Sequence, residues 1–140
     1  MPGKKYIVVG GGDVGCETAM HLDYQGKEIL LVEMEADILR EKASIQTDLM
    51  MRKMIKDMNV DVRLNTRLVR VEGRTAIIQC GGIEEAVDFD GLVLAAGFRA
   101  DYSLEEALVG KVEVTTVGDA DHPARIYDAV RSGFGAAMAI

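Results

Sequence analysis

The chain has 140 residues, a hydrophobic fraction of 49% and a formal net charge of −7. This length and apolar content suit one globular domain of ordinary size with a packed core. The negative charge argues against nucleic acid as the main partner, because phosphate binding requires clustered Lys and Arg. An apolar run of the ~20 residues that a membrane span needs is not present in the sequence, so no membrane partner is expected.

The two cysteines, Cys16 and Cys80, form no spaced motif. Neither a disulfide framework nor a metal site is therefore predicted. The N-terminus does not resemble a secretory signal, because only a short apolar run follows Lys4 and Lys5 before glycines intervene. The expected location is the reducing cytoplasm.

The first informative stretch, residues 6–15, reads Tyr-Ile-Val-Val-Gly-Gly-Gly-Asp-Val-Gly. An apolar run followed by the spacing G-x-G-x-x-G is typical of a strand, a tight turn and a helix whose N-terminus faces a pyrophosphate. The first glycine permits the turn, the second leaves room for phosphates, and the third lets the helix lie close to the sheet. The residues expected to cradle the pyrophosphate are Gly10, Gly11, Gly12, Asp13, Val14 and Gly15.

A second apolar run, 28–33, ends in Glu33, at the distance after the glycines where dinucleotide sites place an acid. This carboxylate is expected to accept hydrogen bonds from the adenosine ribose. A 2′-phosphate there would be repelled by about 4 kcal/mol per charge pair at ~4 Å. NAD(H) is therefore predicted over NADP(H). The alternatives are a glycine turn without a ligand and a solvated strand end at Glu33.

Helices are predicted over 13–25 and 44–58, with a polar connection over 37–42 between them. Apolar residues recur at helical spacing in the second helix, and its methionines favour core packing over a pliable binding groove. Asn59 is expected to end that helix in the left-handed conformation. An alternating strand pattern follows over 60–64.

Three short β-type runs then follow, divided by Glu72-Gly73 and Gly81-Gly82, which suit hairpin turns. A further strand is expected over 91–96, a short helix over 103–108, a strand over 112–117 and a final helix over about 124–139. The predicted class is α/β: a Rossmann-like parallel sheet flanked by helices, an inserted three-stranded antiparallel meander, and a C-terminal strand-helix segment.

Four segments together resemble a known superfamily: Val9–Ala19, Leu30–Met34, Asp90–Phe98 and Val117–Phe134. The sequence resembles the pyridine nucleotide–disulfide oxidoreductases, which are FAD- and NAD(P)-binding flavoproteins. The nearest type is the C-terminal, nicotinamide-binding part of NADH:flavin oxidoreductases such as 2-enoate and 2,4-dienoyl-CoA reductases.

The departures from this family are also informative. Only one glycine fingerprint is present, and the Cys-x-x-Cys redox pair is absent from the sequence. The resemblance then implies an NAD(H)-binding domain over 1–97 and, over 98–140, an extension similar to the closing strand and helix of a missing FAD domain. FAD is expected only in the full-length family context.

The resemblance also implies further site residues. Glu17 would lie near the nicotinamide amide, although an acid in the first turns of a helix also suits the helix dipole. The others implied near the nucleotide are Met34, Ala95, Ala96 and Gly97, and relic flavin contacts are implied at Gly118 and Asp119. No catalytic residue and no metal ligand is predicted.

The leading hypothesis is an NADH-binding module of a flavin-dependent oxidoreductase, which passes hydride from NADH to a flavin and is a fragment without the flavin-binding half. Its expected partners are the dinucleotide and a flavin-bearing domain or subunit, with a homodimer as a further option. The alternative is a non-catalytic NAD(H) sensor of the potassium-transport gating type. A methyltransferase-type fold is a weaker third option.

Overall fold

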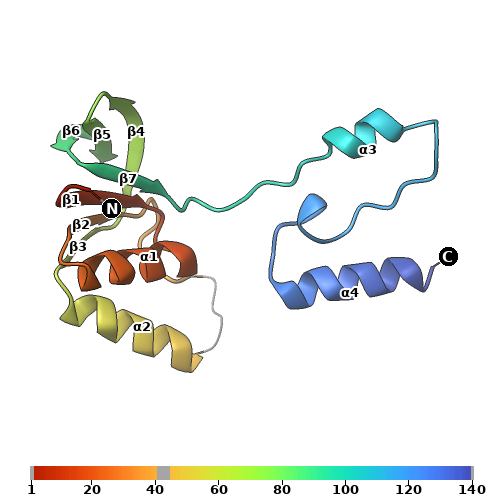
Figure 1. The fold of residues 1–140 in the computed structure, drawn as a ribbon, viewed down its shortest axis with the longest axis horizontal. Helices are drawn as coiled ribbons and strands as arrows, with labels where there is room; N and C mark the ends of the chain where they lie inside the picture. Colours follow the sequence, from red (N-terminus) through yellow and green to blue (C-terminus); the bar gives the residue numbers. More distant parts are fainter. Residues whose placement is uncertain (1, 41–44, 140) are drawn as a thin grey trace. The chain divides into compact units, whose positions relative to one another are not determined.

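The computed structural model of the protein describes residues 2–40 and 45–139. The chain divides into two compact units, Met1–Gly97 and Phe98–Ile140, and each is described by itself (Figure 1). The first unit holds both sheets of the described chain and two helices that cover one face of the larger sheet.

A four-stranded parallel sheet organises the first unit, with the strand order β3-β2-β1-β7. Its strands are β1 (Lys5–Val9), β2 (Glu28–Val32), β3 (Val60–Arg63) and β7 (Gly91–Leu94). The central strand β1 pairs in parallel with β2 and β7. The carboxyl ends of all four strands therefore lie at one edge of the sheet, where open α/β sheets bind ligands.

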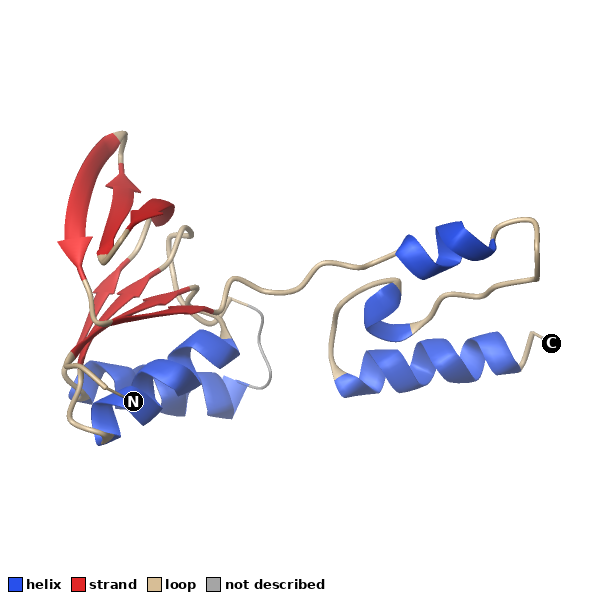
Figure 2. Ribbon diagram, turned by 45° about the horizontal axis from the view of Figure 1, so that its top comes forward, coloured by secondary structure: helices blue, strands red, loops and turns tan. Residues whose placement is uncertain are grey.

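The two faces of this sheet are covered differently (Figure 2). Helices α1 (Asp13–Tyr24) and α2 (Ile45–Asp57) pack on one face. The other face is covered by the antiparallel sheet of β4 (Thr66–Glu72), β5 (Thr75–Cys80) and β6 (Ile83–Asp88). The predicted α/β class with an inserted three-stranded meander is confirmed, with the meander in the place of helices on that face.

The alternating direction of side chains along β1 explains how both faces of the parallel sheet are packed. Tyr6 and Val8 belong to the core cluster beneath the helices, whereas Ile7 packs with Ala76 and Ile78 of β5. Successive side chains of a strand point to opposite faces, so one short apolar strand contributes to two cores.

Some local expectations were wrong. Asn59 does not adopt a positive φ; among the described non-glycine residues, Leu39 and Asn65 do. The first hairpin turn is shifted by one residue, because Glu72 still pairs with Thr75 in the ladder. The polar connection expected over 37–42 is described only as far as Arg40, and the expected first residue of the second helix, 44, also lies outside the described residues.

The second unit consists of α3 (Ser103–Leu108), a 3₁₀ turn at Gly118–Ala120 and α4 (Ile126–Ala137). The strand predicted over 112–117 is not formed: these residues have no strand assignment. A β-strand requires a neighbouring strand for its N–H and C=O groups, and the described part of this unit contains none. Within the described chain, no helix has the length and apolar character needed to cross a bilayer.

Candidate functional site

The glycine turn between β1 and α1 is packed closely against backbone atoms at two of its glycines, Gly10 and Gly15. Gly10 has a φ of +106°, and a Cβ there would lie 2.3 Å from the carbonyl oxygen of Ala95. A Cβ on Gly15 would lie 1.8 Å from the carbonyl oxygen of Gly10. Neither site has room for a side chain, so these two glycines fix the close approach of turn, helix and β7.

Gly12 differs from both, because a Cβ there would meet nothing within 4 Å. It is the N-cap of α1 and provides no side-chain cap for the first helical turn. The N–H groups of that turn, beginning with Asp13 and Val14, lack intrahelical acceptors in any α-helix, and the helix dipole favours an anion beside them. The open space and the uncapped helix start are what a pyrophosphate requires.

Glu33 follows the last residue of β2 and is 8% exposed. Its carboxylate accepts hydrogen bonds from the N–H of Gly11 at 2.5 Å and of Glu35 at 2.8 Å, one on each oxygen. An ionised carboxylate has about four acceptor positions, so two remain for further donors. The structure thus brings together the glycine turn and the strand-end acid, which the sequence analysis had assigned to the same ligand.

The loop after β2 lies beside the glycine turn and contacts it directly. The N–H of Leu39 donates to the carbonyl of Gly11 at 2.7 Å, and Ile38 lies against Gly11. The N–H groups of Asn65 and Thr66 donate to the carbonyls of Glu35 and Glu33, at 2.9 and 2.8 Å. The beginning of the meander is therefore fixed to the same strand end.

A hollow of about 200 Å³ lies between the end of β2 and the meander. One of its lining residues is Met34, which is 69% exposed. Its other lining residues are Asn65, Arg67, Gln79, Gly81 and Gly82. The sequence predicts Met34 near the nucleotide, but no sequence signal indicates the lining residues from the meander. Because those residues come from a different sheet, no spacing rule in the sequence points to them.

The segment after β7 contacts the glycine turn through its first residues. The N–H of Ala95 donates to the carbonyl of Val9 at 2.7 Å, and Ala95 and Ala96 flank Gly10. Gly97 has a φ of +86° and ends the first unit. A Cβ on Gly97 would meet nothing within 4 Å.

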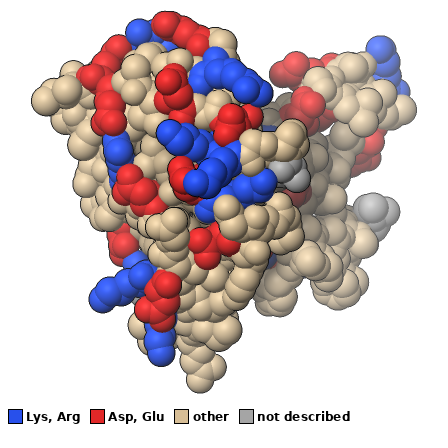
Figure 3. All heavy atoms as spheres, turned by 60° about the vertical axis from the view of Figure 1, so that its left-hand side comes forward, with Lys and Arg blue, Asp and Glu red and all other residues tan. Residues whose placement is uncertain are grey.

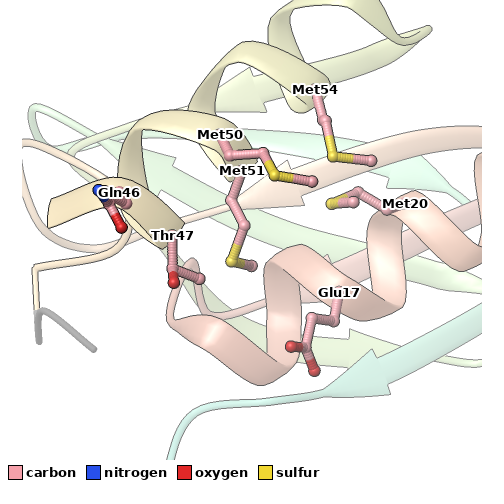
Figure 4. A pocket seen from close by; sticks show the side chains of 7 residues that line it. All are labelled: Glu17, Met20, Gln46, Thr47, Met50, Met51 and Met54. Carbon is pink, nitrogen blue, oxygen red and sulfur yellow. The ribbon is translucent and has the colours of Figure 1, made fainter. Parts of the chain in front are cut away.

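Glu17 is exposed on α1 and does not contact the turn through any hydrogen bond within the described residues. It lies at the edge of a groove of about 380 Å³ between α1 and α2, whose lining also includes four methionines, shown in Figure 4. Met51 is 7% exposed and belongs to the core, whereas Met50 is 64% exposed. The methionines of α2 therefore contribute both to the core and to the lining of an open groove.

Cys16, next to the glycine turn, is fully buried, and its thiol lies 3.4 Å from the carbonyl oxygen of Gly11. Burial, with a smaller contribution from the Asp13 carboxylate, raises the pKa of the Cys16 thiol to about 12. A thiol in this state is not a nucleophile near neutral pH. Within the described residues, no group of His, Cys, Asp and Glu could hold a metal ion.

The two implied flavin contacts belong to the second unit. Gly118 has a φ of +61°, and its N–H donates to Ser132 Oγ at 2.9 Å. The Asp119 carboxylate accepts a hydrogen bond from the N–H of Ala124 at 3.3 Å. Both residues lie in the turn that precedes α4.

Charges of both signs are interleaved on the face of the molecule seen in Figure 3. Arg63 pairs with Glu85 at 2.7 Å and Arg70 with Glu84 at 2.8 Å, so two arginines of the first unit are neutralised by carboxylates of β6. Paired surface arginines do not form the concentrated positive field that nucleic-acid backbones require.

Comparison with known proteins places this geometry in a family. Residues 1–122 match the family described as pyridine nucleotide-disulphide oxidoreductase. The chain is 31% identical over 141 residues to a cinnamate reductase of Clostridium sporogenes, covering 99% of this chain and 21% of the reductase. It is 32% identical over 140 residues to an NADH oxidase of Thermoanaerobacter brockii, covering 98% of this chain and 21% of the oxidase.

A solved structure, that of 2-naphthoyl-CoA reductase in complex with 2-naphthoyl-CoA, superimposes with a TM-score of 0.79 at 26% identity. The match covers 96% of this chain and 21% of that chain. The chain thus spans about a fifth of the length of the curated relatives named above. These comparisons confirm the predicted resemblance to a family whose members are oxidoreductases that use flavin and nicotinamide cofactors, and they give no support to the sensor alternative. The chain therefore belongs to the pyridine nucleotide-disulphide oxidoreductase family.

Proposed function

We propose that residues 1–97 bind NADH across the glycine turn and present it to a flavin carried by another domain or subunit. The observation that carries this proposal is the hydrogen bond from the N–H of Gly11 to the Glu33 carboxylate. It lies next to Gly12, where a Cβ would meet nothing within 4 Å. A carboxylate and an uncapped helix start, fixed side by side, match a ribose joined to a pyrophosphate.

Each part of the nucleotide has a corresponding place. The first-turn N–H groups of α1 hold the pyrophosphate, and the two free acceptor positions of Glu33 take ribose hydroxyls. The hollow beside Met34 takes the adenine, and Ala95, Ala96 and Gly97 lie along the nucleotide on the β7 side of the turn. The family resemblance supports a position of Glu17 toward the nicotinamide end. When bound, NADH supplies a hydride that a flavin accepts.

The carboxylate of Glu33 favours NADH over NADPH. It is buried and held by two backbone N–H groups, so it does not swing away from an added phosphate. At ~4 Å and an intermediate dielectric, each charge pair of the repulsion amounts to about 4 kcal/mol.

The exposed apolar surface of the second unit supports the proposal of a flavin-bearing partner. None of its described residues is buried, and α4 exposes Ile126, Val130 and Phe134 at four-residue spacing. An apolar helix stripe of this kind packs against another element in a folded protein. We infer that residues 98–140, including Gly118 and Asp119, complete a flavin domain supplied in the same polypeptide or in trans, with a homodimer as the competing arrangement.

The direct test is calorimetry of the chain with NADH, NADPH, FAD and S-adenosylmethionine. NADH is expected to bind most tightly. Gly12→Ala is expected to abolish this binding without unfolding the protein, since its Cβ enters only the space assigned to phosphate. Gly133→Ala is the matched control, because its Cβ also meets nothing within 4 Å but lies in α4.

Two results would contradict the proposal. One is a wild-type chain that binds no NADH at ~1 mM, a concentration that detects even a weak complex of about −4 kcal/mol. The other is a Gly12→Ala variant that binds NADH as tightly as the wild type.

A further inference from the structure

One acid of α2 is buried without a hydrogen-bond donor. Asp48 lies in the first turn of this helix, is 5% exposed and shares the buried face of the helix with Met51 and Ile55. Its Oδ1 atom is buried and has no hydrogen-bond partner among the residues that the structure describes. A buried carboxylate oxygen without a donor costs free energy, because it has lost water and gained no replacement. Asp48 therefore destabilises the arrangement in which it is found.

The arginine best spaced to pair with Asp48 binds other groups. Arg52 follows four residues later in α2, which is the spacing at which an acid and a base form an ion pair on a helix. The Arg52 guanidinium instead binds the Asp37 carboxylate at 2.7 Å and the carbonyl of Ile38 at 2.5 Å. The hydrogen bond to Asp37 is the main cause that raises the pKa of Arg52, and the charge of Asp48 raises it further. Both carboxylates therefore act on the same cation.

The ion pair that Arg52 makes joins α2 to the loop after β2. Beyond Asp37 and Ile38 this loop reaches Leu39, whose N–H donates to the carbonyl of Gly11 at 2.7 Å. Leu39 is 1% exposed and has a φ of +53°, a backbone conformation that costs a leucine free energy. The loop is thus held against the glycine turn in a strained conformation, and Arg52 is one of the groups that hold it.

One movement would relieve both unfavourable features, the Asp48 oxygen without a donor and the strained Leu39 backbone. If the Arg52 guanidinium rotates from Asp37 to Asp48, the buried carboxylate gains a donor and the loop loses its tie to α2. Leu39 can then leave the left-handed region. The side chain of Asp37 is 55% exposed, so water solvates it when the guanidinium leaves. The exchange therefore leaves neither the cation nor a buried acid unpaired.

We propose that Arg52 has two alternative partners, Asp37 and Asp48, and that its exchange between them releases the loop of residues 35–39 from α2 and from the glycine turn. In the first arrangement, Arg52 binds the loop, and the loop lies against Gly11. In the second, Arg52 binds within its own helix, and the contact of the loop with Gly11 is lost. The inference goes beyond the proposed function, because it concerns the chain without a ligand and its test requires no nucleotide.

Amide hydrogen exchange, measured residue by residue by NMR, tests this inference. The N–H of Leu39 reports release of the loop, and that of Val8, fully buried in the central strand β1, reports global unfolding. Leu39 is expected to exchange at least tenfold faster than Val8, because local release does not require unfolding. Asp37→Asn is expected to accelerate the exchange of Leu39 about tenfold, because the loop loses its ion pair with α2.

Asp48→Asn is expected to have the opposite effect and to slow the exchange of Leu39 about tenfold. It removes the buried charge from the first arrangement and the partner of Arg52 from the second. In the Arg52→Gln background, the same substitution is expected to change the exchange of Leu39 relative to Val8 by less than about twofold, because no guanidinium remains to change partners. A merely structural role of Asp48 predicts equal slowing in both backgrounds.

Asp57→Asn is the matched control, because Asp57 is an exposed acid at the other end of the same helix. It is expected to change the exchange of Leu39 by less than about twofold. The inference is overturned if Leu39 and Val8 exchange at the same rate in the wild type, or if Asp48→Asn leaves the exchange of Leu39 unchanged. It is also overturned if Asp48→Asn acts equally in the Arg52→Gln background, or if Asp57→Asn slows Leu39 as much.

Discussion

The two units of this chain differ in what holds them together. In the first unit, β1 contributes to two buried clusters, one under α1 and α2 and one under the meander. In the second unit, none of the described residues is buried, although α4 is as long as α1. Helix length therefore does not indicate independent stability, since most helical stability in proteins comes from packing of an apolar face.

The largest expected contrast is between a core leucine and an exposed α4 phenylalanine. Leu31 is fully buried, and Leu31→Ala should lower the free energy of unfolding by about 3 kcal/mol. Phe134 is 68% exposed, and Phe134→Ala should change it by less than about 0.5 kcal/mol. Urea unfolding followed by circular dichroism measures both values. Equal losses would show that α4 is packed against a core.

The next largest effect is expected at Glu33, whose carboxylate accepts a hydrogen bond from Gly11. Glu33→Ala should weaken NADH binding about tenfold and narrow the gap to NADPH, because ribose acceptors and phosphate repulsion are lost together. It should also destabilise the fold by ~1–3 kcal/mol, because the buried N–H of Gly11 loses its acceptor. Calorimetry and urea unfolding separate the two effects. An unchanged cofactor preference would remove Glu33 from the nucleotide site.

A smaller effect is expected from removing the second unit. A chain ending at Gly97 should keep its NADH affinity within about twofold, because every described contact of the turn and of Glu33 lies in the first unit. Its melting temperature should change by only a few degrees, about what 1 kcal/mol produces in a domain of this size. Thermal melts with and without NADH test this. Loss of the folded state would show that residues 98–140 complete the first unit.

The smallest expected effect on stability concerns the thiol of Cys16. The pKa of Cys16 is raised to about 12 in the folded state from an ordinary value of 9.0, so only the unfolded chain loses this proton between those pH values. Stability from this group is thus complete below pH 9 and falls as pH rises toward 12. Thiol labelling at neutral pH should modify exposed Cys80 and leave Cys16 protected. Labelling of both thiols at equal rates would contradict the burial of Cys16.

Local patterns were sufficient for much of the fold. The spacing from Gly10 to Gly15, the apolar run before Glu33 and the paired turn residues of the meander predicted the elements that the structure contains. Each of these signals acts through neighbouring residues or through one sheet edge. The strand expected over 112–117 failed because its pattern is local but strand formation is not.

The arrangement of the candidate site was predictable to the same depth. The glycines and Glu33 follow a spacing rule, whereas Asn65, Arg67 and Gln79 reach the hollow only because β4 and β5 are attached to the end of β2. Contacts between distant elements carry no spacing signal.

If residues 1–97 bind NADH as proposed, the hydrogen bond between Glu33 and Gly11 limits how this protein could change its choice of nucleotide. Exchanging the acid at residue 33 for a small or basic residue would remove an internal tie of the ligand-free fold as well as a contact to the ligand. Evolution toward the phosphorylated coenzyme would then meet fewer obstacles in the exposed loop positions than at the strand end. Laboratory redesign should begin at the loop for the same reason.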